Sequence, residues 1–149
     1  MEITRYIPHR EHMVLIDQID KNFEDDFTTI VNINSDSLLC TEKGVPSYCG
    51  IEYMAQSIAA YSSIYLYSGQ KARIGFIISL RNYQTTKPFF DIGSKLIVKV
   101  SAVLVTHNSG LFDCFIYDAN NEIVSAKIMA FVPNESDLEK LSNGKNNER

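Results

Sequence analysis

Residues 50–68 read GIEYMAQSIAAYSSIYLYS, and this stretch decides the fold. Its apolar side chains recur at positions 51, 54, 55, 58, 59, 65 and 66, which places one stripe on an α-helix. Pro46 and Ser47 precede it as start signals, and Gly69 stands where a left-handed cap belongs. The pattern predicts a helix from Gly50 to Ser68, about 28 Å long. Its many small side chains favour deep burial over the alternative, an amphipathic helix on one sheet face.

Strand patterns surround this helix. Phe27 to Ile33 alternates between two faces, and four later segments, 72–80, 95–106, 111–117 and 122–132, are rich in Val, Ile, Phe and Tyr. Residues 107–110 and 118–121 are predicted hairpin turns, and Asn34 to Val45 is a predicted loop. Thr4 to Asp20 is predicted to be a polar turn or loop that enters a buried strand or turn. This order predicts an α+β fold with an antiparallel sheet.

The chain's size predicts one domain. It has 149 residues, of which 45% are hydrophobic and 21% charged, as in an ordinary globular protein. We expect one domain over residues 1–133 and a polar, disordered tail over residues 134–149. No second domain or internal repeat is predicted.

Charge and cysteine content exclude several classes of function. The net charge of -4 provides no basic field for nucleic acid or an anionic membrane. No segment resembles a signal peptide or a transmembrane helix. Three cysteines without a C-x-x-C spacing indicate neither a disulfide framework nor a zinc site. We therefore expect a cytoplasmic protein with reduced thiols.

Three residues near the start of the helix are candidates for a chemical role. Glu52 is either a carboxylate favoured by the helix dipole or a general acid or base in a buried site. Gln56 follows one turn later, where its amide can orient that carboxyl group. Gly50 either lets a ligand carbonyl approach the backbone or serves only close packing.

Two histidines, His9 and His12, lie close together before the first apolar run. They lack the spacing of a metal site, and the third, His107, falls in a predicted turn. A structural hydrogen bond and a catalytic role are both open for His9 and His12. The chain has no G-x-S-x-G elbow and no phosphate-binding loop.

The motifs match a known family. Residues 7–17, IPHREHMVLID, resemble the L-P-H-R-x-P-M-L-L-V-D opening of the β-hydroxyacyl-acyl-carrier-protein dehydratases. Residues 50–56, GIEYMAQ, resemble that family's helix, and more closely its form in the divergent dehydratases of aryl-polyene gene clusters. The stretch from Phe76 to Leu96 is also similar to a family segment. The resemblance covers residues 5 to 133.

This resemblance implies a hotdog fold, in which a curved antiparallel sheet wraps around one long central helix. It implies dehydration of 3-hydroxyacyl thioesters to trans-2-enoyl thioesters in fatty-acid or polyene-type biosynthesis. The substrate is carried on the phosphopantetheine of an acyl carrier protein or coenzyme A, with no further cofactor. A homodimer, or a heterodimer with another hotdog subunit, is implied. For docking an acidic carrier protein, the basic residues available are Lys71, Arg73, Arg81 and Lys87.

By the same resemblance Glu52 is the proton donor to the leaving hydroxyl group. The predicted substrate-binding residues are Gly50, Ile51, Gln56 and Phe76. The family's histidine in a G-H-F-P sequence has no counterpart between Asp36 and Val45, where Leu38 takes its position. The aryl-polyene type also keeps the P-H motif while losing G-H-F-P, so the resemblance makes His9 the candidate base. The alternatives are an acyl thioesterase and a non-catalytic, thioester-binding subunit of a heterodimeric dehydratase.

Overall fold

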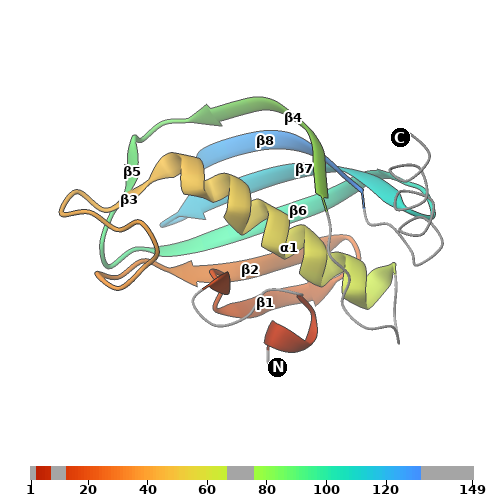
Figure 1. Ribbon diagram of the computed structural model, residues 1–149, viewed down its shortest axis with the longest axis horizontal. Coiled ribbons are helices and arrows are strands. Elements are labelled where there is room, and N and C mark those ends of the chain that lie inside the picture. The colour runs from red at the N-terminus through yellow and green to blue at the C-terminus, as the bar shows by residue number, and fades with distance from the viewer. Residues whose placement is uncertain (1–2, 8–12, 67–75, 132–149) are drawn as a thin grey trace, which may run out of the picture.

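A six-stranded antiparallel sheet and one long helix make up the domain (Figure 1). The computed structural model describes residues 3–7, 13–66 and 76–131. The strands of the sheet, in spatial order, are β1 (Gln18–Phe23), β2 (Asp26–Asn32), β6 (Lys95–Val105), β7 (Ser109–Asp118), β8 (Asn121–Phe131) and β4 (Phe76–Thr85).

A second, two-stranded sheet lies just before the helix in the chain. It pairs β3 (Val45–Pro46) with β5 (Phe89–Phe90). A 3-10 turn, Ser47–Cys49, then leads directly into the helix α1 (Gly50–Tyr65). The start signal predicted at Pro46 and Ser47 is confirmed, since Pro46 caps this turn.

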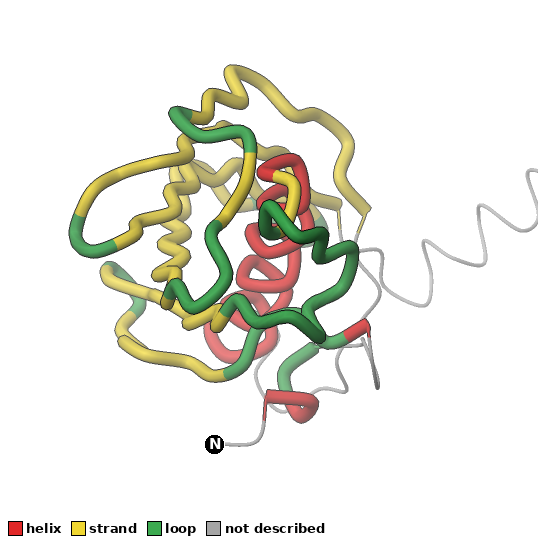
Figure 2. Tube along the Cα trace, turned by 90° about the vertical axis from the view of Figure 1, so that its left-hand side faces the viewer, coloured by secondary structure: helices red, strands yellow, loops and turns green. Residues whose placement is uncertain are grey.

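The helix α1 lies inside the curve of the sheet and packs against β2, β6, β7 and β8 (Figure 2). Buried and half-buried residues alternate over residues 96–101 of β6 and 109–116 of β7, the period expected of a sheet with one face on a core. Their inward side chains include Val98, Val100, Phe112 and Ile116, all at most 1% exposed. The predicted α+β arrangement, with a curved antiparallel sheet around one buried helix, is confirmed.

Small side chains let the helix approach β2. Ser57 and Thr29 are fully buried, and their hydroxyl oxygens lie 2.7 Å apart. The Ser57 hydroxyl also donates to the carbonyl oxygen of Tyr53 at 2.8 Å, so Thr29 donates to Ser57. This hydrogen bond fixes the position of α1 along β2, because a shift would leave a buried hydroxyl group without a partner.

Three boundaries within the described residues differ from the sequence prediction by two residues or more. The helix ends at Tyr65 rather than Ser68, although the N–H of Leu66 still donates to Ser62. Strand β4 continues to Thr85, beyond the predicted end at Leu80. Its register shifts twice along β8, and Asn82 has a φ of 54°, so the polar residues there form an irregular strand that alternation could not reveal. Strand β7 begins at Ser109, inside the predicted turn.

The N-terminal part of the chain holds an element that the pattern missed. Strand β1 lies at one edge of the sheet and is mostly exposed, so it carries no apolar alternation. The predicted turn at 118–121 is confirmed, since Ala119 and Asn120 both have positive φ, as in a type I′ hairpin turn.

Several predictions lie outside the described residues. These concern the tail over residues 134–149, the cap at Gly69, the strand start at Ala72, and His9 and His12. Within the described part, none of the helices has the length and apolar character needed to cross a membrane.

We expect Ser57→Ala to lower the free energy of unfolding by about 1–3 kcal/mol, because it leaves the buried Thr29 hydroxyl group without its partner. Adding Thr29→Val should recover part of this loss. Urea denaturation of both variants measures the effect, and Ser101→Ala on the opposite face serves as control. Equal stability of Ser57→Ala and the wild type would show that the hydrogen bond contributes nothing.

Candidate functional site

The side-chain amide of Gln56 is the centre of the site. It is fully buried, and its Nε2 donates to the carbonyl oxygen of Met13 at 2.7 Å and to Oε1 of Glu52 at 3.2 Å. Its Oε1 accepts the N–H of Leu15 at 2.9 Å. Both donors and the acceptor of the amide are thus engaged. Gln56 therefore joins the first turns of α1 to the segment that begins at Met13.

Glu52 is half-buried in the first turn of α1. The hydrogen bond from Gln56 confirms the contact predicted from their spacing, and it restricts the orientation of the carboxylate. Because the side chain is only half-buried, a ligand can reach it. Its role as proton donor stays a prediction.

The N-terminal segment follows the same face of the helix. Ser63 donates from Oγ to the carbonyl oxygen of Tyr6 at 2.6 Å, and the neighbouring Ile7 is fully buried. Ser63 lies two turns, about 10.5 Å, beyond Gln56 on that face. The residues that flank positions 8–12 are therefore both held against the helix face that carries Glu52. His9 and His12 themselves lie outside the described residues.

Gly50 is required by packing. A Cβ atom there would lie 2.6 Å from the hydroxyl oxygen of Tyr83 and 2.9 Å from Cδ1 of Ile116. The Tyr83 hydroxyl donates to the carbonyl oxygen of Ser47, and the N–H of Gly50 donates to the same oxygen. The structure thus supports the packing alternative for Gly50. The contact of Tyr83 with the start of α1 was not predicted from the sequence, because Tyr83 belongs to none of the motifs.

The two remaining predicted substrate residues lie at separate places. Ile51 is half-buried at the start of α1. Phe76 opens β4, but its side chain lies outside the described part of the structure. A substrate contact stays a prediction for both.

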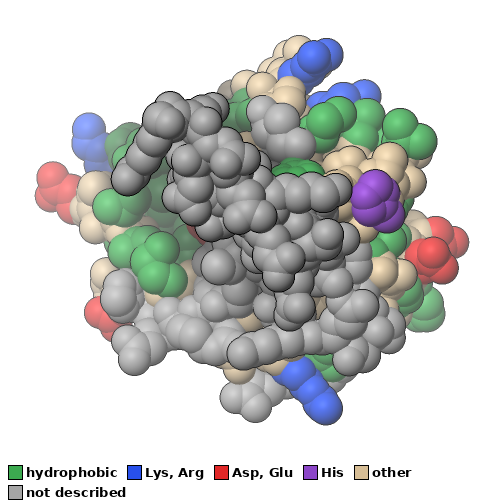
Figure 3. Space-filling model, turned by 45° about the vertical axis from the view of Figure 1, so that its right-hand side comes forward, with side chains coloured by type: hydrophobic (Ala, Val, Ile, Leu, Met, Phe, Trp, Pro, Cys, Tyr) green, Lys and Arg blue, Asp and Glu red, His purple; other side chains and the backbone are tan. Residues whose placement is uncertain are grey.

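No histidine among the described residues lies beside Glu52. The loop position of the missing family histidine holds Leu38, which is 37% exposed. The histidine that the structure describes is His107, which is exposed in the turn between β6 and β7. This turn lies at the opposite end of the domain from the start of α1 (Figure 1), and Figure 3 shows a histidine side chain at the surface. His107 is therefore unsuited to act with Glu52.

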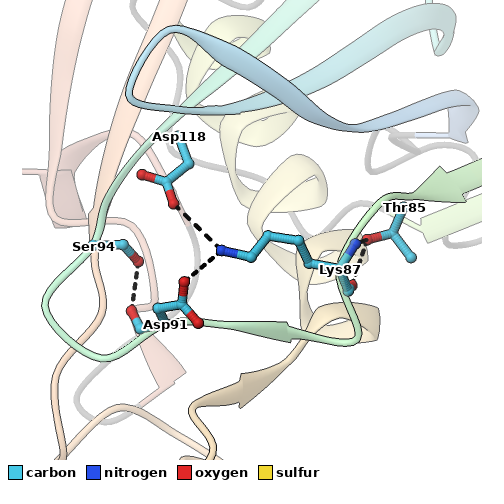
Figure 4. A network of polar contacts seen from close by, with 5 residues as sticks. All are labelled: Thr85, Lys87, Asp91, Ser94 and Asp118. Carbon is cyan, nitrogen blue, oxygen red and sulfur yellow. Dashed lines mark hydrogen bonds and ion pairs between the residues drawn. The ribbon is translucent and has the colours of Figure 1, made fainter.

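A polar network holds the turn that leads from β4 into β5 (Figure 4). The Lys87 ammonium group bonds to the Asp91 carboxylate and lies 3.9 Å from that of Asp118. The hydrogen bond to Asp91 raises the pKa of Lys87. Because two carboxylates neutralise its charge, Lys87 is a poor docking residue for an acidic carrier protein. Arg81, by contrast, is exposed on β4.

All three cysteines are free thiols. Cys49 and Cys114 are buried, and burial raises the pKa of both, so these two thiols stay protonated at neutral pH. Protonated thiols are weak nucleophiles. Cys49 therefore does not supply a nucleophile at the start of α1.

Comparison with known proteins defines the class. The structure of the dehydratase heterocomplex ApeI:P from Xenorhabdus doucetiae superimposes with a TM-score of 0.84 at 25% identity, over 96% of this chain and 98% of that chain. A hypothetical thioesterase from Streptococcus pneumoniae, crystallised with coenzyme A, gives a TM-score of 0.60 at 15% identity, over 78% of this chain and 85% of the other. The domain is a hotdog fold, as predicted.

Sequence comparison identifies the family. Residues 1–143 match the ApeP-like family, described as ApeP dehydratase. The chain belongs to the ApeP-like dehydratase family, which confirms the resemblance seen in its motifs. No curated protein shows significant sequence similarity to the chain.

We expect Gln56→Leu to destabilise the protein by about 1–3 kcal/mol, because the Met13 carbonyl and the Leu15 N–H group, whose hydrogen bonds to Gln56 are partly buried, lose their partner. Thermal or urea unfolding measures this effect. Gln18→Leu, on the exposed strand β1, is the matched control. If Gln56→Leu and Gln18→Leu have the same free energy of unfolding, the hydrogen bonds of Gln56 do not hold the N-terminal segment in place.

Proposed function

We propose that this chain dehydrates 3-hydroxyacyl thioesters to trans-2-enoyl thioesters in fatty-acid or polyene-type biosynthesis. The substrate is bound to the phosphopantetheine of an acyl carrier protein or coenzyme A, and no other cofactor takes part. The observation that carries the proposal is the Gln56 amide, which bonds both Glu52 and the segment that follows the family's P-H-R motif. A cytoplasmic location is part of the same proposal.

The reaction needs one base and one acid. His9 takes the proton from Cα of the substrate, the electron pair forms the Cα=Cβ bond, and the bond from C3 to the hydroxyl oxygen breaks. Glu52 gives its proton to the leaving oxygen, which departs as water. His9 stands four positions before Met13 in the sequence, and the carbonyl oxygen of Met13 accepts a hydrogen bond from Gln56, the neighbour of Glu52 on the helix.

The start of α1 would polarise the thioester carbonyl group. Peptide dipoles place partial positive charge at this end, and negative charge develops on the carbonyl oxygen as the Cα proton leaves. Gly50 is the proposed contact of that carbonyl group, and Ile51 and Phe76 are the proposed apolar contacts of the substrate.

We expect Glu52→Gln to reduce dehydration by at least about 100-fold, because the amide has no proton to give to the leaving oxygen. The assay follows formation of the enoyl thioester from a 3-hydroxyacyl-pantetheine substrate. Glu42→Gln, an exposed glutamate in the preceding loop, is the control. Full activity of Glu52→Gln would contradict the proposed role, whereas release of free thiol without dehydration would indicate a thioesterase.

A second hotdog subunit is the proposed partner. Strand β4 forms an open edge of the sheet. Ile77 and Leu80 pair with the inward-facing Ala130 and Ile128, yet they are 39% and 36% exposed. Inward apolar residues that the described part of the chain leaves partly exposed, beside a strand at the edge of the described sheet, fit a surface that another subunit completes. The heterocomplex of the relative ApeI:P supports this pairing.

We expect Leu80→Glu to abolish association with this partner, whether it is a second copy or a different hotdog chain. Light scattering after gel filtration, with the chain alone and co-expressed with a hotdog chain from the neighbouring gene, measures the mass. Val103→Glu, exposed elsewhere on β6, should leave association unchanged. Equal masses for Leu80→Glu and wild type would exclude β4 from the interface.

A non-catalytic role is the second candidate function. The absence of a histidine between Asp36 and Val45, together with the heterocomplex relative, favours it. In that case the assembled complex keeps its dehydration rate when this chain carries Glu52→Gln, but loses it when association is blocked by Leu80→Glu. The two variants together therefore separate the candidate functions.

A further inference from the structure

An open cleft of about 260 Å³ lies between the segment Val14–Asp17, the end of β2 and the loop that follows it. Val14, Leu15, Val31 and Tyr53 provide its apolar surface. The volume far exceeds the roughly 30 Å³ of one water molecule and approaches the lower limit of small-molecule sites, about 300 Å³. The cleft is large enough for a small organic ligand.

Tyr53 lines this cleft with an unsatisfied hydroxyl group. The residue is 3% exposed, and no hydrogen-bond partner of its hydroxyl lies among the described residues. A buried hydroxyl without a partner is costly, so such a group marks a place where a ligand or water completes the structure. Burial, with smaller contributions from Cys49 and Asp17, raises the pKa of Tyr53, so the phenol stays neutral.

The rim of the cleft is acidic. Asp17 and Asp36 both line it, and none of its described lining residues is basic. Asp17 accepts the N–H of Asn32 at 2.7 Å, and the N–H of Asp36 donates to Oδ1 of Asn34 at 2.8 Å. These hydrogen bonds hold the two aspartates at the rim. The resulting field favours a cation and disfavours carboxylate or phosphate groups.

We propose that the cleft beneath the loop after β2 binds a small organic ammonium ion, with its apolar body against Val14, Leu15 and Val31. The ammonium group bonds to the Asp17 and Asp36 carboxylates and to the Tyr53 hydroxyl oxygen. This inference does not depend on dehydratase activity, because Tyr53, Asp17 and Asp36 take no part in the proposed reaction. The two sites share one wall, since Leu15 also bonds to Gln56.

Three molecules of similar shape and different charge test the proposal: benzylammonium, benzyl alcohol and benzoate. Each is titrated into the isotope-labelled full chain, and the backbone amide shifts are followed by NMR. We expect shifts at Val14–Asp17 and residues 31–38 with benzylammonium, weaker shifts with benzyl alcohol and none with benzoate. Equal shifts with all three, or shifts elsewhere, would overturn the proposal.

Two variants locate the binding groups. Asp36→Asn should weaken benzylammonium binding by about 10-fold, the effect of losing one charge-assisted hydrogen bond, whereas Asp25→Asn in the β1–β2 turn should not. Tyr53→Phe should weaken binding without lowering the free energy of unfolding, because it removes a hydroxyl group that bonds to none of the described residues. Unchanged affinity in both variants would show that these residues do not bind the ligand.

Discussion

The hydrogen-bonding requirement of one buried amide governs the arrangement of the site. Gln56 has no contact with solvent, so both of its donors and its acceptor must be satisfied within the protein. Glu52 and the backbone of Met13 and Leu15 meet this requirement. A single side chain thereby couples the start of the long helix to a segment about forty residues earlier in the chain. The orientation of Glu52, the proposed acid, depends on it.

The same helix accommodates its surroundings through small side chains. Ser57 meets Thr29 on β2, and Gly50 admits the hydroxyl group of Tyr83 from β4. A larger residue at either position would force the sheet away from the helix, because protein interiors are closely packed. The first turns of α1 are thus positioned from two sides of the curved sheet. This explains how a helix end can act as a fixed element of a binding site.

Two surfaces are incompletely covered by the residues that the structure describes, and each has a different character. The inner face of β4 exposes Ile77 and Leu80, which is an apolar surface suited to another subunit. The cleft below the loop after β2 combines an apolar lining with two carboxylates and the buried Tyr53 hydroxyl group. The first surface is continuous with a sheet edge, where main-chain groups can pair. The second is concave and polar, which suits a small molecule.

The sequence by itself determined the long helix, most strands and the family, because periodicity and short motifs are local properties of the chain. It also indicated the Glu52–Gln56 pair, since residues four apart share a helix face. Strand β1, the irregular continuation of β4 and the role of Tyr83 could not be predicted. The contacts of Gln56 with Met13 and Leu15, and the cleft around Tyr53, join segments far apart in sequence. These contacts and this cleft are determined only in the tertiary structure, because they arise from the way the sheet closes around the helix and not from any local sequence pattern.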